Sequence, residues 1–343
     1  MRPSTDPATT GFSFLTTAYR TERYIPETIE SVLAQTCDDW EMVVVDNGMS
    51  EEMARVVKPY LADPRIRLVR QENRGYTGGI AAAAERARGS ILCLLDSDDH
   101  LMPEFCARVG AVFDAEPGAA AVACDAHLFT DDGSVPGGYM RSLGAGRRAG
   151  DDRLTIRRVL GGEVPYYTAA IRREAWDAVG AYASGLDDVD ESVIVWLRLA
   201  SQFDVRMIPD RLARYRLRGD SDSRDESTVE NFERQLLRSF ESGEVWATTK
   251  EDVAALDATL RRLRYHQSLR RARWAFRDGD LAGARAAARA AFSQRRTLRA
   301  AVALSAVTVA PGVVRQLYPA KQRVSAAAAW VVERVASRGR SRC

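Results

Sequence analysis

The chain has 343 residues, 46% of them hydrophobic and 28% charged, as in an ordinary globular protein with room for one large or two average domains. Its five cysteines lack C-x-x-C spacing and its three histidines form no ligand pattern, which excludes a disulfide framework and a zinc site and fits a reducing compartment. The net charge of +2 hides 19 Lys/Arg against 3 Asp/Glu in residues 261–343, which leaves 30 basic and 44 acidic residues before them. Halves of opposite sign indicate two functional parts.

The first 95 residues alternate between short apolar runs, typical of strands, and apolar residues at helical spacing. We expect strands at 12–16, 40–45, 66–69 and 91–95, with helices at 25–35, 51–61 and about 79–88 between them. Pro26 suits the first turn of the first helix, where its missing N–H costs little. This alternation predicts an α/β fold with a doubly wound, mostly parallel central sheet flanked by helices. The polar N-terminus carries no signal peptide pattern, so we expect a cytoplasmic protein.

Three carboxylates follow the buried strand Ile91–Leu95 within four positions, at Asp96, Asp98 and Asp99. Carboxylates this close repel one another, and water screens them poorly at the end of a buried strand. Alternate residues of an extended chain point the same way, so Asp96 and Asp98 can share one target. A divalent cation that is itself bound to phosphate oxygens suits this arrangement, whereas a solvated acidic turn is the plain alternative.

Ligands of open α/β sheets bind beyond the carboxyl ends of the strands. The predicted strand ends at Thr17–Tyr19, Asp46 and Asp96–Asp99 converge there and outline a nucleotide site. A dinucleotide-binding dehydrogenase would need G-x-G-x-x-G after the first strand, and that turn contains no glycine. The later Gly75, Gly78 and Gly79 suit either a flexible helix lead-in or close approach to phosphate.

The second half continues with an expected strand at 119–124, a long loop at 131–162 with a short helix near 154–160, a strand at 164–171, and helices at 172–179 and 192–202. From about residue 225 the chain turns helical, and Asp278-Gly279-Asp280 separates two helices of an expected αα-hairpin. Residues 300–314 are uncharged but contain Pro311-Gly312, too short a stretch to span a bilayer. With Tyr318, Trp330 and the arginines they suit either peripheral contact with an anionic membrane or helices with a solvated arginine face. No aromatic pattern for nucleic-acid binding accompanies the charge.

Several segments together resemble the family 2 glycosyltransferases. They are Ala18–Thr36, Val43–Gly48, Glu72–Gly75 and Leu94–Asp99, in matching order and spacing across about residues 12–223. The resemblance implies a GT-A catalytic domain over residues 11–224 with a basic, alanine-rich helical extension over 225–343. It also implies a nucleotide-diphospho-sugar donor linked to UDP, GDP or dTDP, a Mn²⁺ or Mg²⁺ ion, inversion at the anomeric carbon, and a sugar or lipid-linked acceptor.

The resemblance assigns the site residue by residue. Tyr19, Glu22 and Asp46, with Thr17, would line the base and ribose site, and Asp96 would reach the ribose or the metal. Asp98, with Asp99, would hold the metal and diphosphate, with Ser97 in the same turn. The donor set is completed by Arg74, Gly75 and Arg218. Arg218 stands where the family often has a histidine, and it cannot ligate a metal but can bind diphosphate oxygens.

The catalytic base stays open between Asp190 and Glu191. The family's base is the Asp of a Glu-Asp pair before a helix like the one containing Trp196-Leu197-Arg198. Without a gap this pair aligns with Glu191 and Ser192, and with one inserted residue it aligns with Asp190 and Glu191. Both acids would also suit a helix N-terminus through the macrodipole.

The departures leave a rival hypothesis, a catalytically weak relative that binds nucleotide-sugar or acts as a scaffold. Asn47 and Met49 replace the family's second Asp and its Ser, and Ile80-Ala81 replaces an Arg-Asn pair. Ser192 and Arg218 also favour the rival, whereas the intact cluster of three carboxylates opposes it. A nucleotidyltransferase would need a basic, glycine-rich first loop, which is absent.

Overall fold

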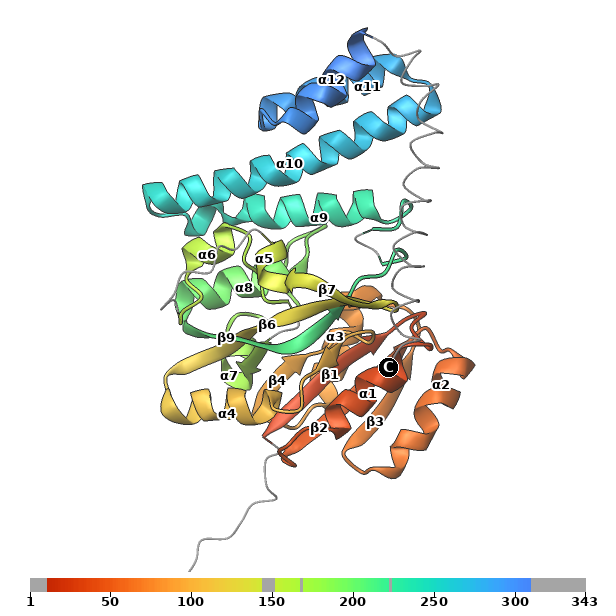
Figure 1. Ribbon diagram of the computed structural model, residues 1–343. Helices are drawn as coiled ribbons and strands as arrows, with labels where there is room; N and C mark the ends of the chain where they lie inside the picture. The colour runs from red at the N-terminus through yellow and green to blue at the C-terminus, as the bar shows by residue number, and fades with distance from the viewer. Residues whose placement is uncertain (1–10, 144–151, 167–168, 222–223, 310–343) are drawn as a thin grey trace, which may run out of the picture. The chain divides into compact units, whose positions relative to one another are not determined.

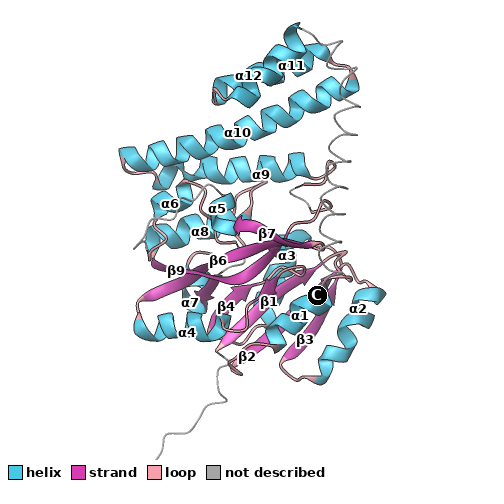
Figure 2. Cartoon of the chain, in the orientation of Figure 1, coloured by secondary structure: helices cyan, strands magenta, loops and turns pink. Residues whose placement is uncertain are grey.

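The computed structural model describes residues 11–143, 152–166, 169–221 and 224–309 (Figure 1). The chain divides into two compact units between Thr259 and Leu260. This division lies after the sequence-based domain boundary at 224/225, which remains a prediction about the extent of the catalytic domain. Every strand of the described residues belongs to the first unit, as Figure 2 shows.

The first unit is built on a nine-stranded mixed sheet with the order β3-β2-β1-β4-β8-β6-β9-β5, and β7 pairs with β6. Four neighbouring strands are parallel, as expected: β1 (Phe12–Ala18), β2 (Trp40–Asn47), β3 (Ile66–Gln71) and β4 (Ile91–Leu94). The side chains of β1, β2 and β4 are buried throughout, which explains their continuous apolar character. The parallel half of the sheet is therefore the half that the sequence predicts best.

The strand order reverses after β3, because β4 returns to pair with β1. Right-handed crossovers then put α1 (Ile25–Leu33) and α2 (Glu51–Val57) on one face and α3 (Gly75–Arg86) on the other (Figure 1). The predicted helix 51–61 is divided into α2 and the 3-10 helix η1 (Lys58–Ala62), with a proline in its first turn. The reversal lies between β1 and β4, where ligands of such sheets bind.

The other half of the sheet is mixed in direction. β8 (Ala169–Arg172) runs antiparallel to both β4 and β6 (Ala119–Thr130), and β6 runs parallel to β9 (Asp204–Arg216). The predicted strand 164–171 is shorter than expected, and the predicted loop 131–162 contains β7 and two short helices, with residues 144–151 outside the described part. The remaining elements are β5 (His100–Leu101), β7 (Gly133–Gly138), α4 (Phe105–Ala115), α5 (Tyr139–Ser142), α6 (Ile156–Leu160), α7 (Arg173–Ala178), α8 (Glu191–Gln202), α9 (Val229–Ser242) and η2 (Gly243–Trp246).

The second unit consists of helices. α10 (Lys250–Asp278) runs across the division, and α11 (Leu281–Gln294) and α12 (Leu298–Val309) follow it. Asp280 ends the expected hairpin turn by accepting the N–H of Gly283 at 2.8 Å, which caps α11. In the hydrophobic cores of the second unit, alanines of α11 pack with residues of α10 and α12. None of the described helices combines the length and the hydropathy that crossing a bilayer requires. Tyr318, Trp330 and the end of the uncharged stretch lie outside the described residues.

Candidate functional site

The carboxylate turn follows β4 directly, at the carboxyl end of the parallel strands. The Tyr76 hydroxyl donates to Asp96 Oδ1 at 2.9 Å. Burial and the neighbouring Asp98 charge raise the pKa of Asp96 to about 7. Burial also raises the pKa of Asp98, although the Arg218 guanidinium opposes this. The turn thus concentrates more negative charge than its surroundings neutralise, which is the condition that a bound cation relieves.

Two members of the turn point into the protein. Asp99 is 1% exposed, and its Oδ1 accepts the backbone N–H of Arg216 at 2.7 Å. Its Oδ2 is buried and has no hydrogen-bond partner among the described residues. The Ser97 hydroxyl lies 2.8 Å from that of Thr21 in the loop after β1. Because these groups are used to hold the turn, Asp98 is the better-placed of the two proposed metal ligands.

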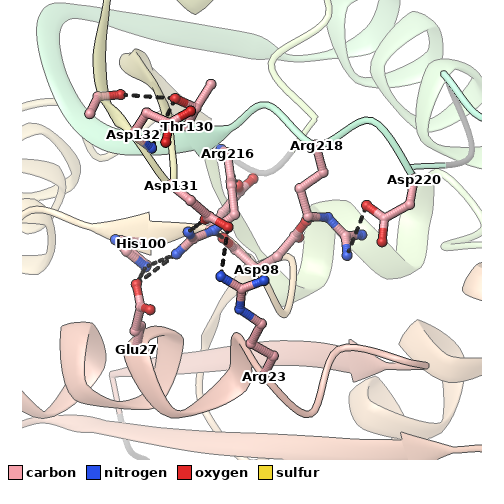
Figure 3. Close-up of polar contacts among 12 residues, drawn as sticks. Arg23, Glu27, Asp98, His100, Thr130, Asp131, Asp132, Arg216, Arg218 and Asp220 are labelled. Carbon is pink, nitrogen blue, oxygen red and sulfur yellow. Dashed lines mark hydrogen bonds and ion pairs between the residues drawn. The ribbon is translucent and has the colours of Figure 1, made fainter. Parts of the chain in front are cut away.

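Arg218 lies directly against Asp98 (Figure 3). Its Nε is 2.7 Å from Asp98 Oδ2, and both side chains are largely buried. The same guanidinium lies 5.0 Å from the ring centroid of Tyr24 and 3.7 Å from Asp220 Oδ1. An arginine held beside this carboxylate can donate charge-assisted hydrogen bonds to phosphate oxygens.

Arg216, two residues earlier, joins the end of β9 to the carboxylate turn (Figure 3). Its side chain is 4% exposed, and its Nε donates to the carbonyl oxygen of Asp98 at 2.9 Å. Its two Nη atoms donate to Asp131 Oδ1 and Glu27 Oε2, each at 2.6 Å. Burial and this guanidinium lower the pKa of His100 to about 4, so this imidazole is neutral at physiological pH. Sequence reasoning missed Arg216, although its alternation with Arg218 along the strand was visible.

The proposed base and ribose residues lie at the ends of β1 and β2. Asp46 is 1% exposed, and it accepts Ser50 N–H with Oδ1 and Arg70 Nε with Oδ2, both at 3.0 Å. Glu22 Oε1 accepts the Ser50 hydroxyl at 2.8 Å. Both carboxylates are thus tied to the residue that caps α2. Tyr19, in contrast, is 45% exposed, and the Arg20 guanidinium lies 5.0 Å from its ring centroid.

Asn47 fixes the segment that contains Arg74 and Gly75. Its Nδ2 donates to Gly75 O at 2.8 Å and to Asn73 Oδ1 at 3.3 Å, while its Oδ1 accepts Arg74 N–H at 3.1 Å and Gln71 Nε2 at 2.8 Å. Sequence comparison treats this residue only as a departure from the family's Asp. An ionised aspartate at this position could accept the hydrogen bonds from Arg74 and Gln71, but it could not donate those to Gly75 and Asn73. The departure is therefore matched to the local turn, in which Gly75 has a φ of +69°.

One glycine of this segment, Gly79, is required by packing between α3 and β1. A Cβ at Gly79 would lie 1.9 Å from Thr17 Oγ1, so this glycine allows α3 to approach β1 closely. Thr17 is 8% exposed, and Ile80 beside Gly79 is completely buried. The position where the family has an arginine thus belongs to the core. The Arg74 side chain is exposed at the start of α3 and remains available to a donor.

Asp190 and Glu191 face different partners. Asp190 caps α8 by accepting Ser192 N–H at 3.0 Å, and burial raises its pKa to about 6. Its charge also contributes to the raised pKa of Asp96, which places the two carboxylates within electrostatic range of each other. Glu191 instead accepts the N–H and the hydroxyl of Ser184 and holds the preceding loop. Of the two candidates, Asp190 is thus the one whose charge acts on Asp96, whereas Glu191 is engaged by Ser184.

Aromatic side chains connect Asp96 with α8. The ring of Tyr76 lies 6.2 Å from that of Tyr182, which lies 5.0 Å from that of Trp176. The Tyr182 hydroxyl is 2.7 Å from that of Ser192. None of these side chains was assigned from the sequence, because scattered tyrosines carry no motif. The rings of Tyr76 and Tyr182 thus form a continuous line of contacts from Asp96 to Ser192.

The residues fit a divalent cation only together with a donor. Among the described residues, no three His, Cys, Asp or Glu side chains form a group that could hold a metal ion. Mg²⁺ and similar ions are commonly held by one or two carboxylates plus substrate phosphates, and Asp96 and Asp98 supply that number. Burial raises the pKa of both carboxyl groups, so their ionised forms would be favoured by a nearby positive charge.

Sequence comparison finds a similarity between part of this chain and a known family. A family model described as glycosyl transferase family 2 matches residues 13–179. The provisionally named glycosyltransferase EpsH of Bacillus subtilis is 32% identical over 102 residues, which are 29% of this chain and 30% of EpsH. Chondroitin synthase of Escherichia coli is 35% identical over 88 residues, which are 25% of this chain and 13% of that protein. The matches thus span a third or less of these relatives' lengths.

Solved structures agree on the fold. S. aureus TarS 1-349 is similar with a TM-score of 0.54 and 17% identity, covering 82% of each chain. The mannosyltransferase PcManGT from Pyrobaculum calidifontis, in complex with GDP-Man and Mn²⁺, has a TM-score of 0.56 and 18% identity over 94% of this chain and 85% of its own. These neighbours identify the mixed sheet as the GT-A fold. The family match over residues 13–179, just under half of the chain, and these folds together support a glycosyltransferase of family 2.

Proposed function

We propose that the protein transfers a sugar from a nucleotide-diphospho-sugar to an acceptor hydroxyl, with inversion and with Mn²⁺ or Mg²⁺. The observation that carries this proposal is the grouping of Asp96, Asp98 and Arg218 within electrostatic range of Asp190, at the carboxyl end of β1 and β4. The first three residues can bind a diphosphate together with a cation, and Asp190 can take a proton. Both are required in a single-step displacement.

On the donor side, Asp98 and Asp96 would hold the cation, with Asp99 as the buried support of the turn. The cation would supply Lewis-acid stabilisation of the departing diphosphate. Arg218 would add two or more charge-assisted hydrogen bonds to the same oxygens. Tyr19, with Thr17, Glu22 and Asp46, would bound the base and ribose, and Arg74, Gly75 and Ser97 would bound the rest of the donor.

On the acceptor side, Asp190 would accept the proton of the attacking hydroxyl. A carboxylate with a pKa near 6 is ionised at neutral pH and is a stronger base than an ordinary aspartate. Attack from the α8 side, opposite the leaving diphosphate, would invert the anomeric carbon. A cell-surface polysaccharide, a glycolipid or a secondary metabolite are the acceptors we consider, and the names of the chondroitin and hyaluronan synthases support the first.

A hydrolysis screen of UDP-, GDP- and dTDP-sugars with Mn²⁺ tests the proposal. The wild type should turn over at least one donor, and Asp98→Ala should abolish this turnover. Asp114→Asn, an exposed carboxylate on α4, is the matched control and should keep the wild-type rate. Structures of TarS contain UDP-GlcNAc or UDP, and the structure of PcManGT contains GDP-Man. UDP-GlcNAc and GDP-Man are therefore the first two donors to try.

The same screen separates the rival, a catalytically weak nucleotide-sugar-binding or scaffold relative. The rival is favoured by the burial of Ile80 and by the ion pair that already neutralises Asp98. Donor binding in a thermal-shift assay without turnover of any donor would support the rival and refute transfer.

A further inference from the structure

Helix α12 has apolar residues on two opposite faces. Ala300 and Val307 are buried in the cores of the second unit, at 0% and 6% exposure. Leu298, Val302 and Val309 are 82%, 59% and 82% exposed within the described part of the chain. Spacings of four and seven residues return to the same side of a helix, so these three side chains form one outward stripe. We call it the α12 stripe.

The α12 stripe is unusual for a helix at the surface of a globular unit. Such a helix normally turns polar and charged side chains outward, and a helix that is apolar all round is covered on all sides. α12 contains no charged residue after Arg299. Its outer face at Ser305 and Thr308 adds only hydroxyl groups. The stripe therefore has the composition of a contact surface.

The charge next to the stripe is strongly positive. Residues 260–309 contain 12 arginines and no lysine, against two aspartates, Asp278 and Asp280. Both acids lie at the turn between α10 and α11, where Asp280 caps α11. The end of the unit at the start of α12 carries Arg295, Arg296 and Arg299, all exposed.

The segment that carries these arginines contacts α10 through Thr297 and Arg295. The Tyr265 hydroxyl lies 2.8 Å from Thr297 Oγ1, and the Arg295 guanidinium lies 5.6 Å from the Tyr265 ring centroid. Burial and four surrounding guanidinium groups lower the pKa of His266, which shows how closely the positive charges gather. The four belong to Arg262, Arg270, Arg295 and Arg299. A preformed basic cluster thus borders an exposed apolar stripe.

We propose that the α12 stripe docks on an anionic lipid bilayer, with Leu298, Val302 and Val309 among the acyl chains at the interface and the three arginines on lipid phosphates. A helix lying in the interface combines these two properties, and neither an aqueous surface nor a neutral bilayer satisfies both. This docking does not depend on sugar transfer, although it would bring the enzyme to a lipid-linked acceptor.

The test is flotation of the full chain with phosphatidylcholine vesicles that contain either no phosphatidylglycerol or about 30% of it. The wild type should float only with the anionic vesicles. Removing one arginine should lower the partition coefficient about fivefold, so the triple variant Arg295→Gln, Arg296→Gln, Arg299→Gln should lose about a hundredfold. Leu298→Asp should lose about tenfold or more, because it puts a charge into the stripe.

Val245→Asp, at a 73% exposed apolar residue of the first unit, is the matched control and should float like the wild type. The substituted side chains are exposed, so circular dichroism should be unchanged for every variant. Docking is refuted if the wild type stays at the bottom with anionic vesicles, if it floats equally with neutral ones, or if Leu298→Asp and Val245→Asp behave alike. Soluble dimerisation through the stripe, seen by light scattering and lost in Leu298→Asp without any flotation, would also refute it. Donor hydrolysis is measured separately and should be the same in all these variants.

Discussion

Replacing Asp190 with asparagine separates its two uses, as helix cap and as proposed base. Asn caps a helix as well as Asp does, so the hydrogen bond to Ser192 N–H can be kept. The amide cannot take a proton from an acceptor hydroxyl. We therefore expect Asp190→Asn to lower kcat by about 10²–10⁴-fold with little change in donor affinity.

Although kcat should fall, the free energy of unfolding of Asp190→Asn should rise. Burial raises the Asp190 pKa from 3.8 to about 6, so the native state disfavours the ionised carboxylate. The cost is absent below about pH 4, grows as the pH rises towards 6, and is then constant. Two pKa units correspond to about 3 kcal/mol, so Asp190→Asn should raise the free energy of unfolding by up to about 3 kcal/mol at pH 7.5 and by almost nothing at pH 4.

Three measurements check this reasoning: kcat with a productive donor and acceptor, the pH profile of kcat, and urea unfolding at both pH values. Wild-type kcat should fall about tenfold per pH unit below pH 6, and the residual rate of Asp190→Asn should lack that limb. Glu191→Gln is the matched control and should lose less than about tenfold, because Glu191 holds Ser184. A kcat within fivefold of the wild type for Asp190→Asn, or an equal loss in both variants, would refute the assignment.

Three further outcomes follow from the geometry. Arg216→Met should lower the free energy of unfolding by about 1–3 kcal/mol in urea titrations, because it removes the donors to the Asp98 carbonyl oxygen and to the half-exposed carboxylates of Glu27 and Asp131; an unchanged midpoint would contradict this. Gly79→Ala should cost about 1–3 kcal/mol, since its Cβ meets Thr17 Oγ1, whereas Gly118→Ala, with nothing within 4 Å, should not. Arg218→Ala should tighten Mn²⁺ binding in the absence of donor about tenfold by calorimetry, because it frees Asp98 from its ion pair; weaker binding would show that the arginine does not compete with the metal.

The parallel half of the sheet was predictable because each strand is a continuous apolar run that ends in polar residues. Ile91–Leu95 is the clearest case, and its three carboxylates stand where the sequence placed them. The antiparallel β8 was predicted too long, because Val164 and its neighbours are apolar without belonging to the sheet. Apolar residues indicate burial, and only the pairing partner decides where a strand begins.

The details of the candidate site were less predictable, because they depend on contacts between distant residues. Arg216 is separated from Asp99 by 117 positions, and no local pattern announces that their atoms meet. Asn47 was visible only as a missing Asp, and its value appears once the backbone groups of residues 73–75 surround it. The choice between Asp190 and Glu191 likewise needed the position of Ser184.

The anchoring of the carboxylate turn by Arg216 bears on how the protein matures. The stretch that the family model recognises ends at residue 179, so it contains the turn but neither β9 nor the two arginines behind it. When only that stretch has left the ribosome, Asp98 and Asp99 are present but β9, whose Arg216 bonds to both, is not. Under the proposed function, the donor site is therefore completed late in synthesis, and a fragment ending at residue 179 would carry the matched motifs without Arg216 and Arg218.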